Sequence, residues 1–177
     1  MDSINRQQEE ENINNLEGSE AISKVRELVK NVRSCFFLTD LNKVGLPLSI
    51  RPMNVLKIDK HGNLWFLSAK DSHKSEEIHD DPFVHLLFQG QSDFLNIYGL
   101  ASVSEDKEMI NTLWNPLLKT WFTGGKDDPR IIVIKVEPTE GYYWSNKHGE
   151  AVAFIKQTIG SILGKTLDDS IEGKLDM

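Results

Sequence analysis

A short polar segment in the first half of the chain combines a hydroxyl, an imidazole and an ammonium group. Ser72, His73 and Lys74 follow one another where capping residues predict the start of a brief helix. A helix N-terminus presents unpaired amide hydrogens and a partial positive charge, so it attracts anions. Arg51, on a preceding extended segment, could add a bidentate guanidinium. These residues predict a phosphate site, although a capped surface helix with a solvated Lys74 would show the same pattern.

Other groupings of reactive residues are weaker. The segment Gly124-Gly125-Lys126 lacks the upstream glycine and the following hydroxyl of a nucleotide phosphate loop. The five histidines are scattered, and none stands with cysteine or carboxylates at metal-ligand spacing. His85 falls in an apolar run, which is typical of a core or interface histidine rather than a haem ligand. We therefore predict no metal site, and we assign no catalytic residue.

Composition restricts the partners and the compartment. The chain has 177 residues, a formal net charge of −7 and a single cysteine. The acidic balance argues against nucleic acid, which needs a basic face. Cys35 lies in an apolar run typical of a buried thiol, and one cysteine cannot form an intrachain disulfide, which fits a reducing compartment. With no secretory signal and no run of membrane-spanning length, we expect a cytoplasmic protein without a membrane partner.

The elements that must position these residues are mostly strands. Apolar and aromatic runs predict strands over 35–39, 46–58, 64–69, 83–88, 94–104, 131–136 and 141–145. Helical spacing and caps predict helices over 20–33, 72–79, 106–114 and 150–163, with a further helical piece over 117–122. The first three strands look like an antiparallel meander. The whole pattern predicts a mainly β fold, a closed or half-open antiparallel barrel with peripheral helices.

The chain is expected to form one domain between two polar ends. Residues 1–18 carry almost no apolar side chains, so we expect a disordered N-terminal arm. The domain itself is predicted over residues 19–164. Residues 165–177 are predicted to form a polar C-terminal tail.

Several short motifs, taken in order, resemble the general stress protein 26 group. They are Arg51-Pro52-Met53, Gly62-Asn63-Leu64-Trp65-Phe66, Ser72-His73-Lys74, Asp81-Pro82, Leu113-Trp114-Asn115-Pro116 and Tyr143-Trp144. That group belongs to the pyridoxamine 5′-phosphate oxidase-like FMN-binding split barrels, so the resemblance implies an antiparallel split β-barrel. It covers roughly residues 21–145.

The resemblance also implies a homodimer with FMN in clefts between the two barrels. Arg51, Ser72 and Lys74 would bind the FMN phosphate, and His73 stands where the oxidases themselves often have arginine. The resemblance implies that the flavin ring is lined by Met53, Phe66, Leu67 and Ser68. Gln89 would lie near the polar edge of the ring. Trp114 and Trp121 would cover the flavin from the partner subunit.

The function implied is that of an FMN-dependent oxidoreductase of unknown substrate, with a reduced nicotinamide cofactor as a candidate electron donor. Two alternatives stay open. One is a non-catalytic flavin-binding stress protein or sensor, and the other is a split barrel that binds a deazaflavin or haem. The C-terminal region lacks the arginine and histidine pattern of the oxidases that act on the vitamin. Oxidation of pyridoxamine phosphate is therefore not expected.

Overall fold

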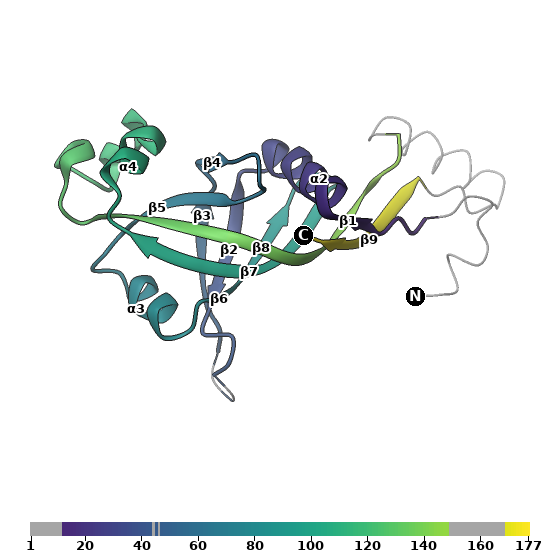
Figure 1. Ribbon diagram of the computed structural model, residues 1–177, viewed down its shortest axis with the longest axis horizontal. Coiled ribbons are helices and arrows are strands. Elements are labelled where there is room, and N and C mark those ends of the chain that lie inside the picture. The colour runs from purple at the N-terminus through teal and green to yellow at the C-terminus, as the bar shows by residue number, and fades with distance from the viewer. Residues whose placement is uncertain (1–11, 44, 46, 149–168) are drawn as a thin grey trace.

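The computed structural model describes residues 12–43, 45, 47–148 and 169–177 (Figure 1). The strands are β1 (Leu16–Glu17), β2 (Ser34–Thr39), β3 (Ser49–Asn54), β4 (Lys57–Ile58), β5 (Leu64–Ala69), β6 (Phe83–Gln89), β7 (Phe94–Ser104), β8 (Ile131–Asn146) and β9 (Ser170–Asp176). The helices are α2 (Gly18–Asn31), α3 (His73–Asp80) and α4 (Lys107–Leu113), followed by the 3-10 turns η1 (Pro116–Thr120) and η2 (Gly125–Asp127).

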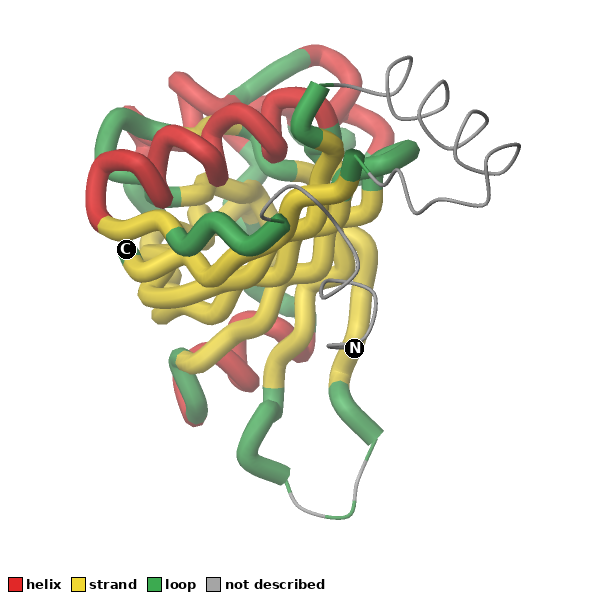
Figure 2. The backbone as a smooth tube through the Cα atoms, turned by 90° about the vertical axis from the view of Figure 1, so that its right-hand side faces the viewer, coloured by secondary structure: helices red, strands yellow, loops and turns green. Residues whose placement is uncertain are grey.

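These strands form one sheet in the order β1-β9-β8-β7-β6-β2-β3, with β5 joined to β8 and β4 to β5. All pairs of named strands are antiparallel except β1 with β9. Figure 2 shows the strands curving over one another with helices against the outside. Within the described residues β3 and β5 do not pair, so the sheet is not closed into a barrel. The mainly β prediction is confirmed.

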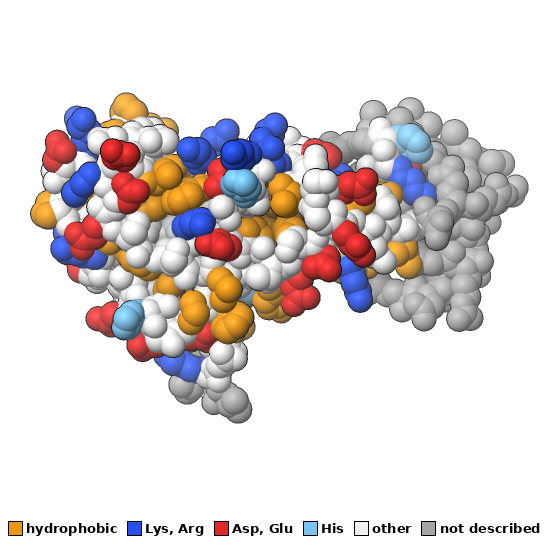
Figure 3. Space-filling view, in the orientation of Figure 1, with side chains coloured by type: hydrophobic (Ala, Val, Ile, Leu, Met, Phe, Trp, Pro, Cys, Tyr) orange, Lys and Arg blue, Asp and Glu red, His pale blue; other side chains and the backbone are white. Residues whose placement is uncertain are grey.

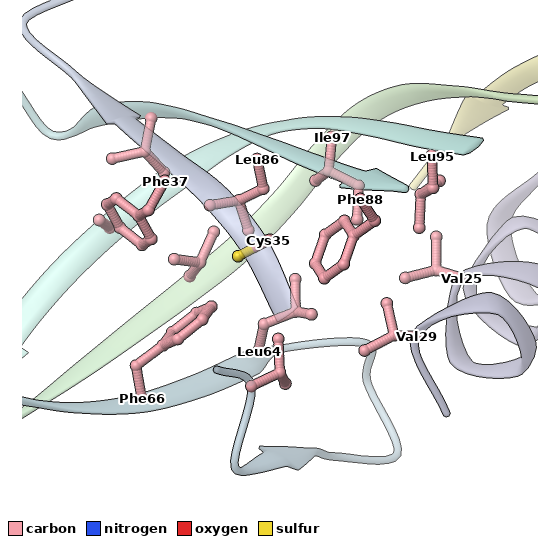
Figure 4. Packing of buried hydrophobic residues seen from close by; sticks show 14 of the residues in the cluster. Val25, Val29, Cys35, Phe37, Leu64, Phe66, Leu86, Phe88, Leu95 and Ile97 are labelled. Atoms are coloured by element: carbon pink, nitrogen blue, oxygen red, sulfur yellow. The ribbon is translucent and has the colours of Figure 1, made fainter. Parts of the chain in front are cut away.

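The main core lies on the concave face of this sheet. Alternate residues of β2 and β6 point into it because neighbouring side chains of a strand face opposite ways. Phe37 and Phe66 meet edge to face with ring centroids 5.4 Å apart. Figure 4 shows both side chains within this cluster. Cys35 belongs to the same cluster, and burial raises the pKa of its thiol to about 12. The prediction of an inert, buried cysteine fits this position.

A second, smaller core lies on the other face of β5. It joins the strands β5 and β8 to α4 through Leu67, Ile110, Leu113, Phe122, Ile131 and Val133. Asp106 caps α4 by accepting hydrogen bonds from the main-chain N–H groups of Glu108 (2.9 Å) and Met109 (3.1 Å). Because the two faces of β5 belong to different cores, consecutive residues of this strand pack alternately into the main core and into the second core.

Two of the predicted strand arrangements are wrong. The runs over 131–136 and 141–145 are one strand, β8, which continues through Pro138. The register shifts beside Gly99, which pairs with Pro138, and a β-carbon on Gly99 would lie 2.5 Å from the carbonyl oxygen of Glu137. A bulge of this kind accommodates a proline inside a strand. The expected meander is also broken, because β5 pairs with β8 and not with β3.

The predicted arm and tail meet each other where the structure describes them. Residues 170–176 of the predicted tail form β9, and residues 16–17 of the predicted arm form β1 beside it. Ile13 bridges to Glu172, and the Tyr143 hydroxyl donates to the carbonyl of Asn14 at 3.0 Å. Main-chain pairing orders these segments, and their few apolar side chains, Leu16, Ile171, Leu175 and Met177, pack against the main core, which the mostly polar composition did not reveal. Residues 1–11 and the predicted helix over 150–163 lie outside the described residues.

Candidate functional site

Arg51 lies at the open end of the main core. It shares the inner face of β3 with Met53 and pairs with Phe37 of β2 across the sheet. Its Nη1 donates to Oε2 of Glu77 at 2.5 Å and to Oγ1 of Thr39 at 3.2 Å. The Thr39 hydroxyl donates to the same Glu77 oxygen at 2.6 Å. These donors, Arg51 first, hold the pKa of Glu77 at about 2.

Lys74 lies in the first turn of α3 and is only 9% exposed. Over the part of the chain that the structure describes, its ammonium group has neither a hydrogen-bond partner nor an ion-pair partner. Burial, and then the nearby charge of Arg51, lower the pKa of Lys74, whereas Glu77 acts in the opposite direction. Two cations therefore stand close together with one carboxylate between them, and that carboxylate bonds to Arg51.

The serines add hydroxyl groups beside these cations. Ser72 occupies the N-cap position of α3, but its side chain makes no capping hydrogen bond. The Ser72 and Ser68 hydroxyl oxygens instead lie 3.5 Å apart, which joins the end of β5 to the start of α3. The hydroxyl of Ser72 is thus left for another partner. His73 is exposed at the first position of the helix.

The predicted ring-lining residues divide between the two cores. Met53 packs partly buried against the main core, and Phe66 is completely buried within it. Ser68 is also nearly buried on the same face of β5. Leu67 points the other way into the second core. The structure thus brings Met53 and Ser68 to the face that carries Arg51, whereas Leu67 does not reach that face.

Three other predicted site residues lie elsewhere in this chain. Gln89 is exposed at the far end of β6 from α3, and its neighbour Phe88 takes the inward position. Trp114 packs partly buried near Phe122, with ring centroids 6.5 Å apart. Trp121 is 63% exposed on the surface. None of the contacts that the structure gives for these residues joins them to the Arg51 and Lys74 cluster.

Sequence analysis missed Glu77 and Thr39. Glu77 follows Lys74 by three positions on α3, a spacing that normally suggests an ion pair within the helix. Instead its carboxylate reaches Arg51 on β3 and Thr39 at the end of β2. Only the pairing of distant strands brings these groups together, and a helix spacing gives no signal of it.

His85 stands on the opposite face of the sheet from this cluster. Its Nε2 lies 2.7 Å from Oδ1 of Asn96, and its ring stacks on Tyr98 with centroids 4.0 Å apart. Burial lowers the pKa of His85, and the bond to Asn96 partly offsets that effect. The position agrees with the expectation of a core or interface histidine.

Around His85 the convex face of the sheet carries several exposed apolar side chains, here called the outer face. They are Phe36, Ile50, Phe83, Tyr98 and Leu100, each between 40% and 55% exposed. The strand registers place them side by side across β3, β2, β6 and β7. Figure 3 shows that hydrophobic side chains interrupt the charged surface in several places over the sheet.

The described residues contain neither a metal-binding cluster nor a membrane-spanning helix. There, no three His, Cys, Asp or Glu side chains gather in a way that could hold a metal ion. Equally, none of the helices described is long and apolar enough to cross a membrane. The cluster of Arg51, Lys74 and the two serines is therefore the arrangement that calls for a chemical explanation. Its donors match a phosphate group.

Comparison of sequences places the chain among known proteins. The family described as pyridoxamine 5′-phosphate oxidase like matches residues 20–168. General stress protein 26 of Bacillus subtilis (strain 168) is 33% identical over 78 residues, which are 41% of this chain and 55% of that protein. The chain spans about half the length of the curated relatives that it matches.

Solved structures of general stress proteins have a fold similar to that of this chain. The general stress protein 26 of Bacillus anthracis str. Sterne has a TM-score of 0.60 and 27% identity, covering 69% of this chain and 92% of that one. A general stress FMN/FAD binding protein from Xanthomonas citri has a TM-score of 0.60 and 23% identity, covering 73% of this chain and 91% of that one. The second likeness shows the fold alone, which is the predicted FMN-binding split-barrel type. Since the family model spans most of the sequence and the folds agree, the chain belongs to the pyridoxamine 5′-phosphate oxidase-like family.

Proposed function

We propose that this protein binds FMN and holds it by the phosphate. The observation that carries the proposal is Lys74, a side chain only 9% exposed whose ammonium group stands near Arg51 and has no ion-pair partner among the described residues. Burying such a charge is unfavourable unless a partner compensates it. A phosphate at this position would compensate both cations and accept hydrogen bonds from Arg51 and from the Ser72 hydroxyl.

The residues present fit a flavin phosphate. Arg51, Lys74 and Ser72 would hold it, with Ser68 beside them and Met53 further along the same face of β3. The relative from Xanthomonas citri, named for FMN/FAD binding, supports the choice of ligand. When bound, flavin supplies the capacity to accept or donate a hydride, whereas the protein binds and orients it.

The test compares FMN with riboflavin, which lacks the phosphate. Arg51→Ala and Lys74→Ala should each weaken FMN binding by about 1.5–3 kcal/mol, the range for a hydrogen bond to a charged group. Riboflavin affinity should stay unchanged. Lys70→Ala serves as the control, because Lys70 is a half-exposed lysine nearby whose ammonium lies 3.7 Å from Glu105. FMN titrations of the apo-protein that give equal affinities for all variants would exclude this phosphate site.

We further propose an oxidoreductase of unknown substrate, with a reduced nicotinamide cofactor as a candidate donor. A non-catalytic flavin-binding stress protein is the alternative. Turnover of reduced nicotinamide with an electron acceptor supports the first and separates it from the second. The absorption spectrum of the purified protein tests for a deazaflavin or haem. We assign no catalytic acid or base, and His85 stands on the other face of the sheet, bonded to Asn96.

We also propose that the protein is a cytoplasmic homodimer joined through the outer face. Phe36 and Ile50 are 51% and 55% exposed on this face, and exposed apolar side chains that lie together are typical of an interface. Trp121 is 63% exposed and, with the partly buried Trp114 behind it, is proposed to cover the flavin of the partner subunit. Sedimentation should give a dimer at micromolar concentration, and a flavin-loaded monomer would contradict the proposal.

A further inference from the structure

We propose that Glu77 is a specificity-determining residue of the anion site, because its carboxylate reduces the site's net charge to +1. The site then accepts a phosphate group with one negative charge almost as readily as one with two. This inference rests on the proposed function, since it concerns the same phosphate site.

The carboxylate of Glu77 is fixed in position. Its Oε2 accepts from Arg51 and from Thr39, and Thr39 is completely buried. The side chains of Glu77 and Arg51 are only 14% and 23% exposed. A carboxylate held by two donors at such low exposure stays beside the guanidinium, so an arriving anion meets Arg51 and Glu77 as a pair.

The charges around this pair come from three elements. Arg51 on β3 and Lys74 on α3 contribute two positive charges, and Glu77 contributes one negative charge. Asp40 and Lys43, from the connection between β2 and β3, pair with each other at 2.8 Å and so add no net charge. The described groups nearest to the site therefore sum to about +1.

The effect of this net charge on binding can be measured through the second ionisation of the FMN phosphate. A phosphate monoester passes from one negative charge to nearly two around pH 6. The pKa of Glu77 is about 2, so its carboxylate stays charged throughout that range. The second negative charge of the phosphate gains from Arg51 and Lys74 but is repelled by Glu77. FMN affinity should consequently change by less than about threefold between pH 5 and pH 7.5.

The variant Glu77→Gln separates charge from shape. A glutamine carbonyl can still accept from Arg51 and Thr39, while the negative charge is removed. The FMN affinity of this variant should increase between pH 5 and pH 7.5, and this increase should be about five- to tenfold larger than the increase in the wild type. Glu76→Gln is the matched control, because Glu76 is the neighbouring residue of α3, has the same charge and is exposed. It should behave like the wild type.

The experiment is a titration of the full-length apo-protein with FMN and with riboflavin at both pH values, followed by flavin fluorescence. His73 is exposed on α3 and is the same in all three proteins, so the comparison is between the pH responses of the two variants and that of the wild type. A pH response of Glu77→Gln equal to that of the wild type overturns the inference. So does a loss of the FMN preference over riboflavin in this variant, which would make Glu77 a structural support. If the wild type binds neither flavin, the proposed function itself fails.

Discussion

At the scale of single residues, Lys74 gives the site a dependence on alkaline pH. Burial and the charge of Arg51 lower its pKa below the ordinary 10.5, so the ammonium loses its proton earlier than an exposed lysine would. The affinity for FMN should therefore fall at alkaline pH, and at lower pH values than it would with a lysine of ordinary pKa. In Lys74→Arg the side chain stays charged and the fall should disappear. Titrations of both proteins with FMN at neutral and alkaline pH test this prediction. An equal fall of affinity in both proteins would contradict the role of Lys74.

Asp128 gives a second prediction at this scale, for stability. Hydrogen bonds from the Arg130 side chain, first among several donors, lower the pKa of Asp128 from 3.8 to about 2. Its ionised form therefore stabilises the fold above the unfolded pKa, and this contribution is lost as the pH falls toward 2. Asp128→Asn should have a lower Tm than the wild type at neutral pH, and the difference should shrink near pH 2. A difference independent of pH would mean that the carboxylate charge does not matter.

Residue types and local order were enough to select part of the candidate site. Arg51, Ser72 and Lys74 could be selected because a helix start next to cations is a recognisable arrangement. Glu77 could not, because its partner lies 26 positions away on β3. The capping role expected of Ser72 is wrong for a similar reason. Its hydroxyl lies beside Ser68 of β5 instead of bonding to its own helix.

At the scale of elements, the pairing of the two terminal segments depends on one glycine. A β-carbon on Gly173 of β9 would lie 1.9 Å from the carbonyl oxygen of Asn14, which is too close for any contact. Gly173→Ala should therefore displace residues 13–17 from β9 and lower the Tm. The neighbouring Lys174→Ala is the control, since Lys174 is exposed and only its main-chain N–H bonds to Asn15. Equal melting curves for both variants would show that this contact adds no stability.

Elements with strong local signals were predicted well and those that depend on distant pairing were not. The strand over 64–69 and the strand over 94–104 have the predicted bounds, because each is a bounded apolar or aromatic run. The strand β8 was divided in two because Pro138 interrupts its pattern, although the bulge at Gly99 accommodates it. β9 was missed because its apolar residues are few and separated by polar ones, and its position depends on pairing with the distant strands β8 and β1.

At the scale of the whole molecule, the outer face should control assembly. Phe36→Glu places a charge on that face, where burial against a second copy would be costly. This variant should sediment as a monomer and bind FMN more weakly, while its Tm changes little, because the position is solvent-exposed in the single chain. Leu117→Glu is the control, since Leu117 is 79% exposed on η1, away from the outer face. A dimeric Phe36→Glu variant would rule out this interface.

The unmatched ammonium of Lys74 also bears on how long the protein survives in a cell. Without an anion the molecule keeps two neighbouring cations, Arg51 and the largely buried Lys74, with only one carboxylate beside them, so the empty form should be less stable than the loaded one. A ligand present at a hundredfold excess over its Kd adds about 2.7 kcal/mol and lowers the fraction of unfolded chains open to proteases. Limited proteolysis should therefore cleave the empty protein faster, and FMN should slow the cleavage much more than riboflavin does. Cellular amounts of this protein would then follow the supply of phosphorylated flavin, so that copies made in excess of the cofactor are removed by degradation.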